Sequence, residues 1–230
     1  MLTPPVALTI TLLGGESSGK TALAQALHQH LNQQLQIHTA LVPEQLRLWC
    51  ERMGRAPRAE EQAARAAEQS RCIEEATQQA GVELVIADTS ALVIAAYSEL
   101  YFQDTSLYAA ARATQQRYDL TLLMGLDLPW VPDGLFRDSP AVREATDALL
   151  RRELRTAGVA FQPVYGQGEA RLRQALQAIA TRLGRPLVAD DPVLRQGRGR
   201  WVCDSCSDPD CEHRLFSQLL TTDHTKDPPP

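Results

Sequence analysis

Short apolar runs alternate along the chain with longer stretches in which apolar residues recur at helical spacing. This alternation is typical of an α/β fold, in which a parallel sheet carries helices on both faces. The apolar runs predict strands at residues 6–13, 37–42, 82–87, 120–124 and 160–164. The longer stretches predict helices at residues 20–34, 58–80, 91–100, 104–118, 141–157 and 169–183.

The helix predicted at 141–157 has the clearest ends, because Ser139-Pro140 supplies an N-cap and a first-turn proline and Gly158 follows its last residue. The α/β pattern stops near residue 185, so we expect one domain over residues 1–185. The rest of the chain is expected to form a linker at 186–200, rich in Pro, Gly, Arg and Asp, then a Cys/His module at 201–220 and a disordered tail at 221–230.

Composition narrows the functional classes. The 230 residues are 44% hydrophobic and 22% charged with a net charge of −5, which is globular and gives no bulk electrostatic reason to bind nucleic acid or an anionic membrane. No apolar run reaches the roughly 18–20 residues that span a bilayer, and no signal peptide is evident. We therefore expect a soluble cytoplasmic protein, whose five cysteines are thiols or metal ligands.

Residues 14–21 match the pattern G-x-x-x-x-G-K-[ST] between a predicted strand and a predicted helix. In such a loop, backbone N–H groups and the helix N-terminus face phosphates, the lysine reaches the β- and γ-phosphates, and the hydroxyl of Thr21 binds Mg²⁺. Lys20 is one of only two lysines against 21 arginines, which weakens the alternative of a glycine-rich turn with an incidental lysine. The residues expected to bind ATP are Gly14, Gly15, Glu16, Ser17, Ser18, Gly19, Lys20 and Thr21.

Asp88 stands at the end of the strand predicted at 82–87. This position lies on the ligand-binding edge of an open parallel sheet, where an aspartate can help to hold Mg²⁺. The alternative is that Asp88 caps the helix beginning at residue 91, although Ser90 could serve that cap instead. Both roles for Asp88 stay open at this point.

Glu44, Arg47 and Trp49 follow the second predicted strand and would lie at the same edge. A carboxylate, a guanidinium and an indole together suit a polar, flat substrate with hydroxyl groups. The alternative is an i,i+3 helical pair between Glu44 and Arg47, with Trp49 in the core.

Residues 127–138, with two prolines, one glycine, Trp130 and Arg137, predict an ordered functional loop. As a lid over a phosphoryl-transfer site, this loop would bring Arg137 to the charge on the transferring group; the alternative is a surface arginine.

The sequence resembles the nicotinamide riboside kinase family in four motifs. In order along the chain these are the loop at 14–21, Pro-Glu-x-x-Arg-x-Trp, the strand ending Asp-Thr, and Pro-Trp-x-x-Asp-Gly. The resemblance is to the kinase half of bifunctional proteins that also have nicotinamide-mononucleotide adenylyltransferase activity, and it covers about residues 5–185.

The resemblance implies a P-loop kinase fold with a five-stranded parallel core, ATP and Mg²⁺ as co-substrates, and phosphorylation of the 5′-hydroxyl of nicotinamide riboside. Two positions depart from the family: Ser90 replaces a frequent aspartate, and Phe136 adds one residue before Arg137. The expected catalytic residues are Lys20, Asp88, Glu44 and Arg137. The expected substrate contacts are Glu44, Arg47, Trp49, Tyr97, Trp130 and Asp133.

Two other functions stay open, namely a kinase for another nucleoside or deoxynucleoside, and a nucleotide-dependent P-loop regulator that binds a partner through its Cys/His module. A homo-oligomer is compatible with either.

The Cys/His module at 201–220 reads C-x2-C-x4-C-x-H and supplies enough ligands for a closed tetrahedral Zn²⁺ site, with a redox cluster or coincidence as alternatives. Its ligands would be Cys203, Cys206, Cys211 and His213.

Overall fold

A computed structural model of the protein describes residues 7–132 and 139–187. Its centre is a single sheet of five parallel strands in the order β2-β3-β1-β4-β5. The strands are β1 (Leu8–Leu13), β2 (Thr39–Val42), β3 (Leu84–Asp88), β4 (Leu120–Met124) and β5 (Gln162–Val164). The α/β class and the five parallel strands predicted from the sequence are therefore confirmed.

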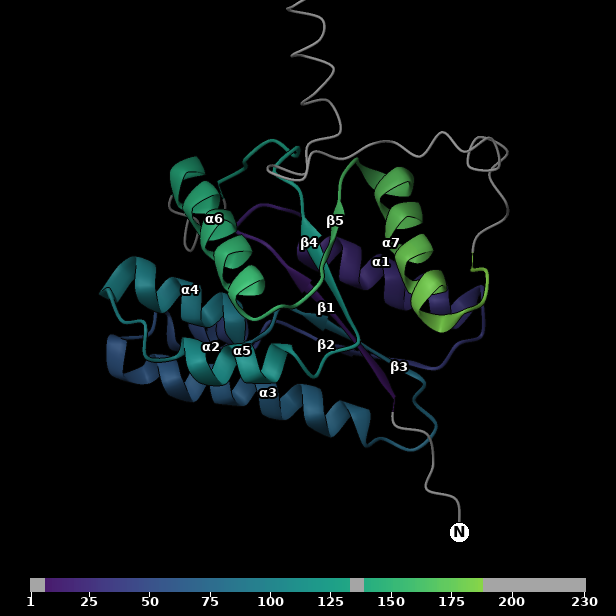
Figure 1. The fold of residues 1–230 in the computed structure, drawn as a ribbon, viewed down its shortest axis with the longest axis horizontal. Coiled ribbons are helices and arrows are strands. Elements are labelled where there is room, and N and C mark those ends of the chain that lie inside the picture. The colour runs from purple at the N-terminus through teal and green to yellow at the C-terminus, as the bar shows by residue number, and fades with distance from the viewer. Residues whose placement is uncertain (1–6, 133–138, 188–230) are drawn as a thin grey trace, which may run out of the picture. The chain divides into compact units, whose positions relative to one another are not determined.

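Helices cover both faces of this sheet (Figure 1). The helices are α1 (Lys20–Gln33), α2 (Gln45–Met53), α3 (Gln62–Thr77), α4 (Ala91–Phe102), α5 (Tyr108–Gln115), α6 (Pro140–Thr156) and α7 (Gly168–Leu183). Leucines of α1 and α7 pack on one face against β1, β3 and β4, while α3 to α6 cover the other. No helix in the described part of the chain is long and apolar enough to cross a membrane.

Three helices differ from their expected form. The helix expected at 104–118 is the shorter α5, Tyr108–Gln115. The helix expected at 58–80 starts with a 3-10 turn, Ala59–Glu61, before α3 begins, and α3 ends at Thr77. Helix α2 was not predicted, because it spans only 9 residues and offers too few turns to show a period. It ends at Gly54, whose φ of 66° is the left-handed conformation typical of a helix C-terminus.

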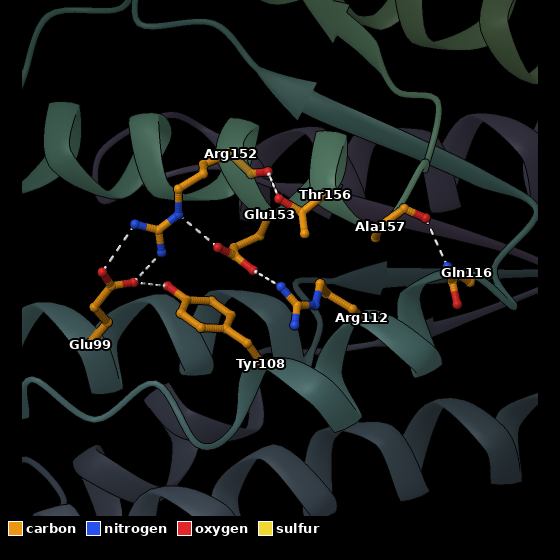
Figure 2. A network of polar contacts seen from close by, with 8 residues as sticks. All are labelled: Glu99, Tyr108, Arg112, Gln116, Arg152, Glu153, Thr156 and Ala157. Atoms are coloured by element: carbon orange, nitrogen blue, oxygen red, sulfur yellow. Dashed lines mark hydrogen bonds and ion pairs between the residues drawn. The ribbon is translucent and has the colours of Figure 1, made fainter.

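A polar network joins α4, α5 and α6 on the side of the molecule shown in Figure 2. The Arg152 guanidinium and the Tyr108 hydroxyl both donate hydrogen bonds to Glu99, and Arg152 and Arg112 both donate to Glu153. The bonds from Arg152 and Tyr108 lower the pKa of Glu99, and burial together with the carboxylate of Glu99 raises the pKa of Tyr108. The network anchors α4 to α6.

Candidate functional site

The loop between β1 and α1 closes around the ammonium group of Lys20. Its Nζ donates hydrogen bonds to the carbonyl oxygens of Gly14 (2.9 Å) and Gly15 (3.0 Å). Ser18 Oγ donates to the same Gly15 oxygen at 2.7 Å. Lys20 is only 7% exposed, so this loop holds a buried cation at the N-terminus of a helix, which is the arrangement that binds phosphate groups.

The glycines of this loop are explained by close packing, in addition to access of the phosphate groups. Gly19 has φ +80°, and a Cβ there would lie 2.8 Å from Nη1 of Arg171 and 2.9 Å from Cδ1 of Leu128. A Cβ on Gly15 would lie 2.7 Å from the backbone oxygen of Arg143. A side chain at Gly15 would therefore meet backbone, and one at Gly19 would displace the ends of the Arg171 and Leu128 side chains.

Arg171 of α7 supports the loop from behind. Its Nη1 donates to the carbonyl oxygen of Ser18 at 2.7 Å, and its Nη2 donates to Asp127 Oδ1 at 2.8 Å. Burial lowers the pKa of Arg171, and the adjacent Asp127 carboxylate acts in the opposite direction. Arg171 was not predicted from the sequence, although its helical spacing from the apolar Ala175 and Ile179 indicates a position on the buried face of the helix.

Thr21 and Asp88 meet beside the loop. Thr21 Oγ1 donates to Asp88 Oδ2 at 2.5 Å, and Asp88 Oδ1 is buried with no hydrogen-bond partner within residues 7–132 and 139–187. The cap of α4 is made by Ser90, whose Oγ accepts from the N–H of Leu92, so Asp88 does not have that role. A hydroxyl and a carboxylate with an unpaired oxygen are hard oxygen donors, so they fit Mg²⁺.

The residue after Asp88 has an unusual backbone conformation. Thr89 has φ +80°, which a β-branched residue adopts at a cost of about 1–3 kcal/mol. Its N–H donates to the carbonyl oxygen of Leu12 at 3.1 Å. Such strain persists only where surrounding contacts hold it, and it is concentrated at functional sites.

A cavity of about 890 Å³ extends from this loop to other segments of the chain. One wall holds the loop with Lys20 and Thr21, and the other walls come from α2 with residues 54–57, from Gln62 of α3 and from the end of α4. Glu44, Arg47 and Tyr97, all predicted from the sequence as substrate contacts, line it together. The cavity thus joins a phosphate-binding loop to carboxylate, guanidinium and aromatic groups.

Trp49 lies elsewhere. It is 7% exposed, packs in the core against α4, and is not among the described residues that line the cavity. The guanidinium carbons of Arg55 and Arg65 lie 4.8 Å and 5.4 Å from its ring centroid. The core alternative for Trp49 therefore describes its position, because α2 turns this side chain inward.

The structure gives a different result for each of the other residues that the sequence predicts to contact substrate or the transferring group. Arg47 pairs with Glu51 at 3.0 Å, an i,i+4 pair within α2. Trp130 is not among the described residues that line the cavity. Asp133 and Arg137 lie outside the described residues, so their roles stay predictions.

The Cys/His cluster also lies outside the described residues, and its zinc site stays a prediction that metal analysis of the purified protein would test. The ligands concerned are Cys203, Cys206, Cys211 and His213. Within residues 7–132 and 139–187, no group of three or more His, Cys, Asp or Glu side chains could hold a metal ion.

Several residues that line the cavity were not predicted from the sequence. Tyr101 and Phe102 continue the aromatic wall of α4, and the rings of Tyr97 and Tyr101 lie 6.1 Å apart. Their spacing along an apolar helix could have marked this face, but core residues show the same spacing. Arg55 also lines the cavity, and its two bonds to Glu61 help to lower the pKa of Glu61 to about 2.

Cys50 lines the cavity next to these residues. Burial raises the pKa of its thiol, and the Glu44 carboxylate raises it further. Cys50 and Cys72 are both free thiols, as expected of a chain without structural disulfides in its α/β domain. The raised pKa keeps Cys50 neutral and makes it a weak nucleophile.

A phosphate-binding loop between the first strand and the first helix of this parallel sheet defines the P-loop NTPase class. A family model described as "AAA domain" matches residues 9–171, and the chain belongs to this family. No curated protein matches the sequence.

Three solved structures share the fold. A NadR protein in complex with NAD and AMP-PNP has 20% identity and a TM-score of 0.66, and covers 81% of this chain and 52% of its own. NadR in complex with NR has 21% identity and a TM-score of 0.66, with 81% and 53% covered. Thymidylate kinase from Ehrlichia chaffeensis has 15% identity and a TM-score of 0.53, with 77% and 99% covered. The chain thus spans about half the length of NadR.

Proposed function

We propose that this protein is an ATP- and Mg²⁺-dependent kinase whose acceptor is nicotinamide riboside, phosphorylated on its 5′-hydroxyl to nicotinamide mononucleotide. The observation that carries the proposal is the cavity of about 890 Å³ that connects Lys20 and Thr21 with Glu44 and Tyr97. A phosphate donor and a hydroxyl acceptor need such a shared space, because transfer requires the two groups in line. The NadR structures with AMP-PNP and with NR support the choice of donor and acceptor.

On the donor side, backbone amides of residues 15–21 would bind the phosphates of ATP, and Lys20 would bridge its β- and γ-phosphates. Thr21 and Asp88 would hold Mg²⁺, which supplies positive charge to the oxygens of the transferring group. Arg137 is proposed to add charge from the lid. Because catalysis of phosphoryl transfer is mainly positioning and charge stabilisation, this set needs no covalent intermediate.

On the acceptor side, Glu44 or Asp88 would orient the hydroxyl group and accept its proton. The ring face of Tyr97 would stack on the base, and aromatic faces favour a cationic ring such as nicotinamide in its riboside. Arg47 lines the same cavity, and Asp133 and Trp130 are proposed as further contacts from the lid segment.

The test is ADP release with ATP and Mg²⁺ across a panel of acceptors that includes nicotinamide riboside, thymidine, thymidylate and the common nucleosides. We expect release that depends on nicotinamide riboside. Release with a different nucleoside or nucleotide would keep the kinase and replace the acceptor, and the likeness to thymidylate kinase makes thymidine and thymidylate the first alternatives. ATP hydrolysis that no acceptor changes would contradict the kinase and favour the P-loop regulator.

A further inference from the structure

One buried amide in α3 contacts the backbone beside Glu44, which lines the cavity, and beside Asp88, which pairs with Thr21. Gln69 is 0% exposed, in a helix whose other buried positions include Ala66, Ile73 and Ala76. A polar side chain among apolar neighbours is costly unless both its oxygen and its NH₂ group are hydrogen-bonded. The hydrogen-bond partners of Gln69 therefore decide whether its burial at this site is tolerated.

The contacts of Gln69 lie on either side of Glu44 and directly after Asp88. Its Oε1 accepts the N–H of Gln45 at 2.8 Å. Its Nε2 is directed at the carbonyl oxygens of Pro43, at 3.5 Å, and Thr89, at 3.4 Å. Pro43 and Gln45 are the sequence neighbours of Glu44, so one side chain connects the two loops that carry Glu44 and Asp88.

The hydrogen bonds of Gln69 lie just beyond the point where the pairing of β2 with β3 ends. The last paired residues of β2 and β3 are Val42 and Ala87, and beyond them the two strands have no further ladder contact. Thr89 is also in the left-handed conformation, which requires support from neighbouring groups. Gln69 provides such support, and it is not among the described residues that line the cavity.

We infer that Gln69 is a positioning residue, which holds Glu44 at a set distance from Asp88 so that the acceptor hydroxyl faces the transferring phosphoryl group. The inference rests on the proposed function, because that function places the acceptor hydroxyl at Glu44 or Asp88 and Mg²⁺ at Asp88. Gln69 contacts only the backbone of these segments, and none of its hydrogen bonds reaches the loop at residues 14–21 or Lys20.

The first test is Gln69→Met, which keeps the length of the side chain and removes its hydrogen bonds. We expect kcat with the acceptor to fall about 10- to 100-fold, since a displacement near 1 Å at a reacting group has effects of this size. The KM for ATP should stay within about twofold, because Lys20 and its loop are untouched. Amide hydrogen exchange of Gln45 should become faster.

The matched control is Gln115→Met. Gln115 is equally buried, and its amide contacts Thr11, Thr121 and Ser90 but neither Pro43 nor Gln45. We expect a similar loss of thermal stability with kcat reduced less than threefold and no change in exchange at Gln45. Equal loss of kcat in the two variants would show that Gln69 only stabilises the fold.

Gln69→Glu keeps the inference testable if Gln69→Met does not fold. The carboxylate still accepts the Gln45 N–H but loses the donor that faces Pro43 and Thr89, and protonation restores one O–H donor. Burial raises the pKa of such a carboxyl group, so the ratio of variant to wild-type kcat should rise as pH falls. A ratio that does not change with pH would contradict the inference.

The two proposals fail in distinguishable ways. If the wild-type protein turns over no acceptor in the panel, the proposed function fails. Hydrogen exchange at Gln45 in Gln69→Met and Gln115→Met still tests the connection between the loops. If the acceptor reaction is present and exchange at Gln45 is the same in both variants, only the positioning role of Gln69 is wrong.

Discussion

The two ends of the cavity are built in opposite ways. The phosphate-binding end comes from eight consecutive residues, 14–21, and is fixed by Arg171 and by close approaches to Arg143 and Leu128. The acceptor end comes from α2 with residues 54–57, which directly follow it, and from α4, which lies far from them in the sequence. Its outer aromatic side chains are partly open, with Tyr101 45% exposed.

This difference follows from what each end binds. A triphosphate presents the same oxygens in every nucleotide, so one rigid loop with a helix N-terminus serves for all. Acceptors differ in shape, and helices at the margin of the sheet can change their side chains without disturbing that loop. We therefore expect substitutions at the phosphate end to affect kcat most, and those at the acceptor end to affect the acceptor KM.

The largest expected effect is at the phosphate end. Lys20→Ala removes the cation held between Gly14 and Gly15. We expect kcat for acceptor-dependent ADP release to fall about 100- to 1,000-fold, as when a preorganised charged donor is lost. Circular dichroism should show an unchanged fold. Activity within a few-fold of wild type would contradict the role of this loop in phosphate binding.

Gly19→Ala tests the rigidity of the same end. It combines a left-handed conformation, costing about 1–2 kcal/mol for alanine, with the contacts to Arg171 and Leu128. Gly158→Ala is the matched control, because Gly158 has φ +64° and nothing lies within 4 Å of its Cβ position. Thermal melts should show a loss in both variants. Only Gly19→Ala should raise the KM for ATP, by roughly tenfold, or 1.4 kcal/mol.

Tyr101→Ala examines the acceptor end. The ring lines the cavity and is half exposed, so its loss should affect binding more than folding. Stacking of a base on an aromatic ring contributes about 1–3 kcal/mol, which predicts a rise of roughly 5- to 150-fold in the acceptor KM. Steady-state kinetics should show an unchanged KM for ATP, and Tyr101→Phe should behave like wild type. A rise in both KM values would mean that the two ends are not independent.

The smallest effect concerns the anchor of α4 shown in Figure 2. Arg152 and Tyr108 lower the pKa of Glu99, so this pair stabilises the fold above the ordinary glutamate pKa of about 4.3. That stabilisation is lost as pH falls through the lowered value. Arg152→Gln should cost about 0.2–1 kcal/mol near neutral pH, because the pair is partly exposed.

Melting temperatures measured from pH 7 downward should show the difference between Arg152→Gln and wild type shrinking below about pH 4. The acceptor KM should not change, because the core contacts of α4 hold its cavity face in place. A difference that grows toward acid would show that Glu99 is not the group stabilised by Arg152.

Local patterns were enough for the strands and the nucleotide loop. Each depends on residues that are neighbours in sequence. Short apolar runs between stretches of helical spacing predict the strands, and two glycines before a lysine predict the loop. Asp88 was expected at the sheet edge for the same reason, since the end of a buried strand can be recognised within a few residues.

Only the tertiary structure decided which side chains face the cavity. Trp49 and Tyr101 are both aromatic residues of helices, yet packing of α2 turns the first into the core and α4 directs the second to the cavity. Arg171 and Gln69 have meaning only through residues about 150 and 20 positions away. The sequence by itself determined the phosphate chemistry, because that chemistry is local, and long-range packing decided the acceptor side.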